Sequence, residues 1–273
     1  MKLPRPRPSS SSTTPLFLSL LLLLAAGQGS TAATVGNTNT TNANANANAN
    51  ANTNAIDACV AAEPAPGDAC PLVHVIAARE TTTPPGFGSA RTLVDLLART
   101  FPGATAEAIT YPAAGGADYG ASVAEGVGAV VAQTARFAAR CPESIIVMHG
   151  YSQGAQIMDD AFCGGPDLPQ LNSSGVSLVS PAVANNVAAI ILMGNPRHVA
   201  GLPFNVGNAT AGGFAARPAG FKCPEFEKRL QAYCDSPDPF CSNGTDPATH
   251  QGYGREYGRD ALIFVVSKML TSN

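Results

Sequence analysis

The chain has no tryptophan among its 273 residues, and only 13% of its residues carry a charged side chain. The absence of indole rings argues against an aromatic platform for binding carbohydrate. A formal net charge of −3 at pH 7 makes nucleic acids and anionic membranes unfavourable partners, because both select basic surfaces. Beyond the first 30 residues no apolar run approaches the roughly 18 residues that a membrane span needs. The simplest remaining expectation is one soluble domain, since 45% hydrophobic content can supply a substantial core.

The first 30 residues have the pattern of a secretory signal peptide. Lys2, Arg5 and Arg7 precede a leucine-rich run at residues 16–26, which is too short to span a bilayer and is followed by small residues. We therefore expect residues 1–30 to be removed and the mature protein to be secreted to the extracellular space. Losing these three cations changes the formal charge from −3 to −6.

Residues 31–69 are expected to be a disordered spacer, because the asparagine, alanine and threonine of residues 37–55 cannot form a core. The globular domain is placed at residues 70–273. All seven cysteines lie beyond the signal peptide, and secretion makes disulfides the default expectation, with one cysteine left over. Four Asn-x-Ser/Thr sequons are candidate glycosylation sites, at Asn39, Asn172, Asn208 and Asn243.

Apolar segments compatible with strands alternate along the domain with segments of helical periodicity. The predicted strands lie at residues 72–78, 105–111, 144–149 and 188–193, with a short fifth on a sheet edge at 229–233. The predicted helices lie at residues 86–100, 121–140, 153–163 and 253–270. This alternation indicates an α/β fold with a five-stranded parallel sheet and helices on both faces.

Gly150, Ser152 and Gly154 stand where the third predicted strand meets the third helix. This G-x-S-x-G pattern between a strand and a helix fits a nucleophile elbow, in which the serine takes a strained backbone conformation and the glycines allow close packing. Gln153 opens the helix, so its backbone N–H would point at the carbonyl group that the serine attacks. The alternative is a glycine-rich turn with an incidental serine.

Acyl transfer through Ser152 needs a histidine within reach and a carboxylate that orients it. His74 and His149 lie within predicted strands, where a hydrogen-bonded structural role is expected, and His198 lies in a loop where we expect it to be solvated. His250 lies in a polar loop just before the last helix. The serine–acid–histidine order of α/β-hydrolases puts the base at this late position.

The orienting carboxylate is expected between the serine and the histidine. A disulfide from Cys234 to Cys241 would fix a short loop that contains Asp235 and Asp238. The pattern favours Asp238, which is central in that loop, while Asp235 and Asp246 stay open as alternatives.

A series of motifs covers the domain from residue 70 to the C-terminus. In chain order they are C-P at 70–71, A-R-E-T-T at 78–82, P-G-F-G-S at 85–89, G-Y-S-Q-G-A-Q at 150–156, M-G-N-P-R at 193–197, G-L-P-F-N-V-G at 201–207, R-P-A-G-F at 217–221, the loop at 234–241, and H-Q-G-Y-G at 250–254. With these motifs the chain resembles the cutinase and acetylxylan esterase superfamily, carbohydrate esterase family five, and most closely its acetylxylan esterase branch.

The resemblance implies a small, lidless α/β-hydrolase that removes acetyl groups from xylan. It implies Ser152 as nucleophile, Asp238 as acid and His250 as base. It also implies an oxyanion hole formed by the hydroxyl and backbone N–H of Thr81 with the N–H of Gln153. No metal or cofactor is needed, and a monomer acting on acetylated xylan or another ester is expected. The alternatives are a cutinase or broad-specificity esterase and, from another class, an inactive secreted cell-wall protein.

By the same resemblance the cysteines should pair as Cys70–Cys141, Cys163–Cys223 and Cys234–Cys241, which leaves Cys59 as the odd thiol. The chain departs from the family at Ala114, Asn208 and Ser242, where cysteines are usual, and at Asn195, where relatives often have aspartate and which bears on substrate preference.

The expected preference for acetyl groups depends on the segment just before the histidine. Cutinases surround their site with apolar side chains there, whereas residues 242–249 of this chain are polar. We expect this segment to border the cleft, where it would suit sugar hydroxyls better than a long alkyl chain.

Overall fold

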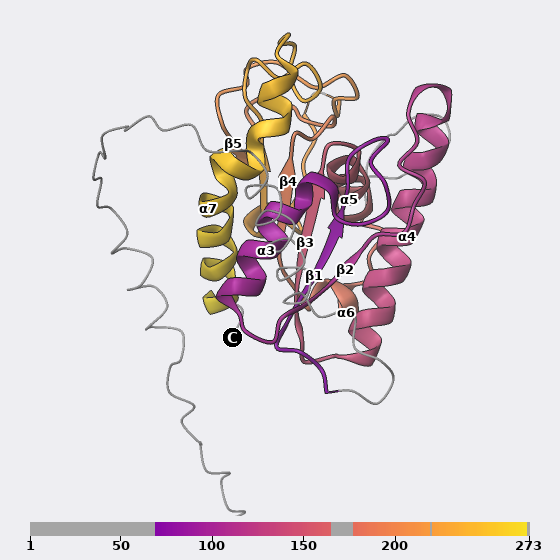
Figure 1. The fold of residues 1–273 in the computed structure, drawn as a ribbon, viewed down its shortest axis with the longest axis vertical. Coiled ribbons are helices and arrows are strands. Elements are labelled where there is room, and N and C mark those ends of the chain that lie inside the picture. Colours follow the sequence, from indigo (N-terminus) through magenta and orange to yellow (C-terminus); the bar gives the residue numbers. More distant parts are fainter. Residues whose placement is uncertain (1–68, 165–176, 219, 272–273) are drawn as a thin grey trace, which may run out of the picture. The chain divides into compact units, whose positions relative to one another are not determined.

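The computed structural model describes residues 69–164, 177–218 and 220–271 (Figure 1). The predicted signal peptide, the spacer up to residue 68, Cys59 and the sequons at Asn39 and Asn172 lie outside these ranges. Within the described ranges, no helix combines the length and apolar character that crossing a bilayer would require.

The centre of the domain is a six-stranded sheet in which all neighbouring strands are parallel, with the order β2-β1-β3-β4-β6-β5. The strands are β1 (Val73–Ala78), β2 (Thr105–Ala108), β3 (Ile145–Tyr151), β4 (Val187–Met193), β5 (Asn205–Val206) and β6 (Leu230–Tyr233). Every residue of β1 and β4 is buried, as expected for parallel strands that are covered on both faces.

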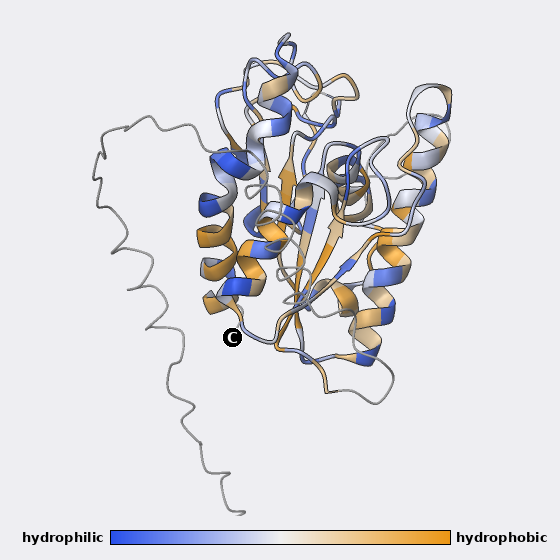
Figure 2. Ribbon diagram, viewed as in Figure 1, coloured by the Kyte–Doolittle hydropathy of each residue, from blue (hydrophilic) through white to orange (hydrophobic). Residues whose placement is uncertain are grey.

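Helices pack on the two faces of this sheet (Figure 1). The α-helices are α3 (Arg91–Thr100), α4 (Tyr119–Arg140), α5 (Gln153–Cys163), α6 (Pro181–Ala184) and α7 (Pro247–Thr271), and the 3-10 turns are η1 (Gly88–Ala90), η2 (Gly116–Asp118) and η3 (Glu227–Arg229). Helices α4 and α5 pack together, as do α3 and α7. Figure 2 shows apolar residues concentrated on the strands and on the helix faces turned toward them.

The two-residue strand β5 makes the prediction of five strands wrong by one. It also moves the segment predicted as an edge strand to the interior, because β6 pairs with β4 on one side and with β5 on the other. Asn205 and Val206 are too few to show the alternation by which a strand is predicted.

The last helix begins at Pro247, not at the predicted residue 253, so His250 lies in its first turn and not in a loop. Proline suits this position, because the first helical residue needs no N–H donor and has a φ angle that proline already adopts. Asp246 precedes the helix and accepts bonds from the Ala248 backbone N–H (3.0 Å) and the Thr249 hydroxyl (2.7 Å). These contacts are those of a helix N-cap.

The three disulfides implied by the resemblance are present. Their Cα–Cα distances are 5.5 Å for Cys70–Cys141, 5.0 Å for Cys163–Cys223 and 6.0 Å for Cys234–Cys241. The first two join distant parts of the chain, whereas the third closes a loop between residues only seven positions apart.

Candidate active site

Ser152 connects β3 to α5 with φ 53° and ψ −119°, a region that costs a non-glycine residue about 1–3 kcal/mol. The two glycines beside it are required by close packing. A Cβ atom on Gly150 would lie 2.6 Å from Ala155 Cα, and one on Gly154 would lie 2.6 Å from the carbonyl oxygen of Arg79. The backbone therefore turns sharply at Ser152, as the G-x-S-x-G pattern predicts.

The side chain of Gln153 fixes this turn to the segment that precedes α4. Its Nε2 donates to the carbonyl oxygen of Ala114 (2.9 Å), and its Oε1 accepts from the Ser122 hydroxyl (3.1 Å). Ser122 also accepts from the backbone N–H of Ala114 (2.9 Å). The sequence indicated a role only for the backbone of Gln153. The hydrogen bonds of its buried side-chain amide show that Gln153 also makes the elbow rigid.

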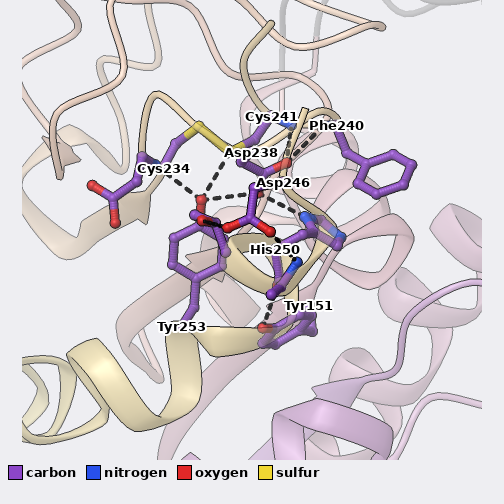
Figure 3. A network of polar contacts seen from close by, with 11 residues as sticks. Tyr151, Cys234, Asp238, Phe240, Cys241, Asp246, His250 and Tyr253 are labelled. Carbon is purple, nitrogen blue, oxygen red and sulfur yellow. Dashed lines mark hydrogen bonds and ion pairs between the residues drawn. A yellow bond between two sulfur atoms is a disulfide. The ribbon is translucent and has the colours of Figure 1, made fainter. Parts of the chain in front are cut away.

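Asp238 is fully buried, and its carboxylate accepts four hydrogen bonds (Figure 3). Oδ1 accepts from the backbone N–H groups of Phe240 (2.6 Å) and Cys241 (3.1 Å). Oδ2 accepts from His250 Nδ1 (2.7 Å) and from the Tyr253 hydroxyl (2.8 Å). Burial raises the pKa of Asp238, but the hydrogen bonds from His250 and the two amides outweigh it and leave the pKa below its ordinary value.

The imidazole of His250 is fixed on several sides. Because the Asp238 carboxylate accepts from Nδ1, the proton of the neutral ring lies on Nδ1 and leaves Nε2 as an acceptor. The Phe240 ring lies 4.5 Å from the imidazole, centroid to centroid. A Cβ atom on Gly194 would lie 2.7 Å from His250 Cε1, so only glycine fits behind the ring.

Two tyrosines that sequence reasoning missed support this arrangement (Figure 3). The Tyr151 hydroxyl donates to the backbone carbonyl of His250 (2.6 Å) and joins the elbow to the first turn of α7. The Tyr253 hydroxyl bonds Asp238 and accepts from the backbone N–H of Asp235 (2.9 Å). Burial raises the pKa of the Tyr253 phenol, which therefore stays a donor. The H-Q-G-Y-G motif contains Tyr253, but its spacing alone does not indicate a contact with the loop at residues 234–241, the acid loop.

A cavity of about 790 Å³ is lined by Ser152, His250 and Thr81, among other residues. Thr81 follows β1 in a loop whose next residue, Thr82, has φ 62° and donates its backbone N–H to the carbonyl oxygen of Ala113 (2.7 Å). The candidate nucleophile, base and oxyanion residue therefore face one space, although they lie up to 169 residues apart in a chain of 273.

The other histidines lie elsewhere. His74 bonds Thr105 and Glu107, and His149 bonds the backbone of Ile191, which confirms the structural role expected for both. Burial lowers the pKa of His149 to about 4 and keeps its ring neutral. The prediction of a solvated His198 is wrong. Its side chain is 4% exposed and bonds the carbonyl oxygen of Ala211, because the long loop after β4 folds over it.

Of the three carboxylates left open by the sequence, only Asp238 bonds His250 among the described contacts. Asp235 accepts instead from the Tyr257 hydroxyl (2.9 Å) and from the backbone N–H of Asn208 (3.0 Å). Asp246 caps α7.

The polar segment 242–249 does not line this cavity, so the expectation that it borders the cleft is wrong. Within the described chain, the part of the wall nearest to that segment is formed by Phe240, His250 and Gln251. Asp246, Ala248 and Thr249 line a different hollow of about 300 Å³. Ala248 and Thr249 already belong to α7, whose first turn carries His250 and Gln251 to the cavity and these two residues to the other hollow.

Asn195 also lies away from the cavity. It is 2% exposed, donates through Nδ2 to Asp159 (2.6 Å) and accepts the backbone N–H of Arg197 (3.0 Å). The departure from the aspartate of many relatives therefore affects a buried polar network beneath the loop after β4.

Comparisons with known proteins agree with this geometry. A family model described as Cutinase matches residues 69–269. Over 207 residues the chain is 54% identical to Cutinase 11 of Verticillium dahliae, covering 73% of this chain and 70% of that protein. It is 50% identical over 206 residues to acetylxylan esterase 2 of Talaromyces purpureogenus, covering 73% and 88%. A solved acetylxylan esterase structure superposes with a TM-score of 0.70 at 49% identity, covering 74% of this chain and 100% of that one.

Proposed function

The chain belongs to the cutinase family, and on that premise we propose that it is a secreted serine esterase that releases acetate from acetylated xylan. The observation that carries the proposal is the Asp238–His250 hydrogen bond of 2.7 Å beside a cavity that Ser152 and Thr81 also line. A buried, oriented histidine that lines one cavity with a strained elbow serine supports a carboxylic ester hydrolase. Relatives about 50% identical carry acetylxylan esterase names.

In the proposed reaction the Ser152 hydroxyl attacks the acetyl carbonyl and gives its proton to Nε2 of His250. The buried carboxylate of Asp238 stabilises the imidazolium that forms. The N–H of Gln153, with the hydroxyl and N–H of Thr81, would bind the oxyanion. The same proton then goes to the departing sugar oxygen, which leaves an acetylated Ser152. Water, deprotonated by His250, attacks this ester, and acetate leaves as the proton returns to the serine.

The wall of the cavity combines aromatic and polar groups. Phe214 and Phe240 are 59% and 40% exposed, and Tyr119 contacts Phe214 edge to face with a centroid separation of 5.6 Å. Thr83 and Gln251 supply polar groups on the same wall. A xylose ring has both apolar C–H faces and hydroxyl groups. Such a mixed wall therefore suits a sugar, although the chain contains no tryptophan.

The second candidate, a cutinase acting on long-chain polyesters, is favoured by the same exposed phenylalanines and by the name of the relative at 54% identity. An alkyl chain buried against such rings gains about 0.8 kcal/mol per CH₂. The polar segment 242–249 no longer argues against this candidate, since it lies outside the wall.

The two candidates differ in the acyl group that they prefer. We expect kcat/KM to fall from acetyl to butyryl to octanoyl esters, and acetate release from acetylated xylan to exceed the release of fatty acids from cutin. The Ser152→Ala variant, purified in parallel, controls for contaminating esterases. A preference for octanoyl esters and cutin over acetyl substrates would assign the protein to the cutinase candidate.

Secretion is part of the proposal. Three disulfides fit a protein that folds in an oxidising compartment, and residues 1–30 have the composition of a signal peptide. The N-terminal sequence of the protein recovered from culture medium tests this, with a start after residue 30 or close to it as the expected result.

A further inference from the structure

Glu80 stands one residue before Thr81 and lines the same cavity. Among the described contacts, the hydrogen bonds of its carboxylate go to neither the elbow nor the acid loop. Both of its carboxylate oxygens accept hydrogen bonds from one residue. Oε2 accepts the backbone N–H of Ser89 (2.9 Å), and Oε1 accepts the Ser89 hydroxyl (2.8 Å). A partly buried carboxylate with two charge-assisted bonds to one partner is a strong and directional contact. It joins the two ends of the segment 80–89, which contains Thr81.

The local sequence is adapted to this contact. Gly88, directly before Ser89, has φ 52°, and a Cβ atom there would collide with Glu80 Oε2 and lie 3.0 Å from the Cβ of Arg79. Any side chain at residue 88 would therefore displace the carboxylate as well as strain the backbone. The glycine of the P-G-F-G-S motif thus has a physical explanation in the position of Glu80.

A second set of contacts, which does not involve Ser89, holds residues 79–83 of the same loop. The buried guanidinium of Arg79 donates to the carbonyl oxygens of Thr83 (2.7 Å) and Tyr111 (2.8 Å). The Tyr111 hydroxyl donates back to the carbonyl oxygen of Arg79 (2.6 Å). A Cβ atom on Gly115 would lie 3.0 Å from the methyl group of Thr81, so the chain after β2 packs directly on that side chain.

We infer that Glu80 is a positioning residue of the oxyanion hole, which holds the hydroxyl and N–H of Thr81 in place through Ser89. The inference rests on the proposed function, because it concerns the same reaction. An oxyanion hole works through donors that are already oriented before charge develops. The Glu80–Ser89 contact would hold the loop where it lines the cavity, and Arg79 would hold it against the chain that follows β2.

The direction of the two Ser89 donors also explains how a carboxylate is tolerated here. A negative charge near the developing oxyanion would oppose the reaction if it were free. Ser89 supplies an N–H to one oxygen and an O–H to the other. These dipoles offset the negative charge of Glu80, while the same two hydrogen bonds hold the loop that carries Thr81.

The test compares Glu80→Ala, Glu80→Gln and Ser89→Ala in the full-length protein, assayed on an aryl acetate. Glutamine can accept the Ser89 N–H and donate to the Ser89 hydroxyl, so it keeps the contact without the charge. We expect Glu80→Ala to lower kcat about 10- to 100-fold, less than the loss of an oxyanion donor itself, with KM changed less than threefold. Glu80→Gln should recover most of that loss, and Ser89→Ala should lose about 3- to 10-fold.

A second readout separates positioning from general stability. Phenylboronic acid forms a tetrahedral adduct with an active-site serine, and its affinity should fall in Glu80→Ala by about the same factor as kcat/KM. The double variant Glu80→Ala/Ser89→Ala should be no worse than Glu80→Ala alone, because both act through one contact. Glu143→Ala, at an exposed glutamate before β3, is the matched control and should behave like the unmodified protein.

Three results would overturn the inference: kcat of Glu80→Ala within twofold of the unmodified protein, an activity loss that only follows a lowered melting temperature, or a raised KM with kcat retained. The last would make Glu80 a substrate contact. In each case Ser152→Ala would still be inactive, so the proposed function would stand. Full activity of Ser152→Ala would instead refute the proposed function itself.

Discussion

The two loops that flank His250 and Ser152 are held in different ways. The acid loop, residues 234–241, is closed by the Cys234–Cys241 disulfide and directs a fully buried carboxylate. The oxyanion loop, residues 79–89, contains no cysteine and is held by the side chains of Arg79 and Glu80. The acid loop must bury a charge permanently, which needs a fixed set of donors. In the proposed mechanism, the oxyanion loop would present donors to a charge that exists only during the reaction.

The largest expected effects concern the three residues of the proposed triad, of which Asp238 lies in the acid loop. Asp238→Asn keeps the shape of the side chain but removes the charge that holds the His250 tautomer, so kcat should fall about 10⁴-fold. Initial rates on an aryl acetate measure this, with circular dichroism to show that the fold is retained. Ser152→Ala or His250→Ala should each lose roughly 10⁴- to 10⁶-fold. An Asp238→Asn variant with a tenth or more of the normal kcat would exclude Asp238 as the acid.

The corresponding change in the oxyanion loop should be smaller. Thr81→Val removes the hydroxyl but keeps the backbone N–H and the bulk against Gly115, so one of the proposed donors is lost and kcat should fall about 10²-fold. Thr83→Val, on the same loop and the same wall, is the matched control and should change kcat much less. Equal effects of the two variants would mean that Thr81 has no special part in the reaction.

Loss of the disulfide should affect the acid loop and not the oxyanion loop. Replacing both Cys234 and Cys241 by serine removes a cross-link between residues seven positions apart, which the loop-entropy model values at about 2–3 kcal/mol. We expect roughly tenfold lower kcat with most of the fold retained, because Asp238 keeps its amide donors but the loop loses its closure. Urea unfolding measures the loss of stability, and initial rates on an aryl acetate measure the loss of kcat. A variant that loses stability without losing activity would show that the staple serves the fold alone.

The smallest expected effect is the response of stability to acid. The pKa of Asp238 is lower in the folded protein than its ordinary value, so its ionised form stabilises the fold. This contribution is fully present above the unfolded-state pKa of about 3.9 and is lost as the pH falls through the lower, folded-state value. Urea unfolding between pH 6 and pH 2.5 should show a steeper decline below pH 4 for the unmodified protein than for Asp238→Asn. Parallel curves would contradict this.

The sequence predicted the parts of the fold that repeat a pattern. The strands β1, β3 and β4 are long apolar runs, and the elbow at Ser152 has glycines where a side chain would collide. The strand β5 could not be predicted, because two residues paired at an edge carry no periodicity. The start of α7 was misplaced for a related reason, since residues 247–252 are polar and only the capping contacts of Asp246 mark them as helical.

The sequence predicted those site residues whose spacing along the chain leaves few candidates. It did not indicate the residues that join the site only through tertiary contacts. Choosing Asp238 from three carboxylates agrees with its hydrogen bond to His250. The contact of Tyr151 with His250 spans 99 positions and that of Tyr253 with Asp238 spans 15, and no local sequence pattern indicates either of them. Closeness to His250 in the sequence does not predict the wall of the cavity, because a helix carries successive residues to different sides.

The bond from the Tyr151 hydroxyl to the carbonyl oxygen of His250 spans 99 positions of sequence. It means that the proposed nucleophile and its proposed base are assembled from a strand in the middle of the domain and from the last helix. During synthesis the elbow is complete long before residue 250 emerges, so a nascent chain has a serine without a base. A contact of such long range carries the entropy cost of closing a large loop. Esterase activity should therefore appear only when α7 docks, which makes the rate of acetate release during refolding a direct report on the docking of α7.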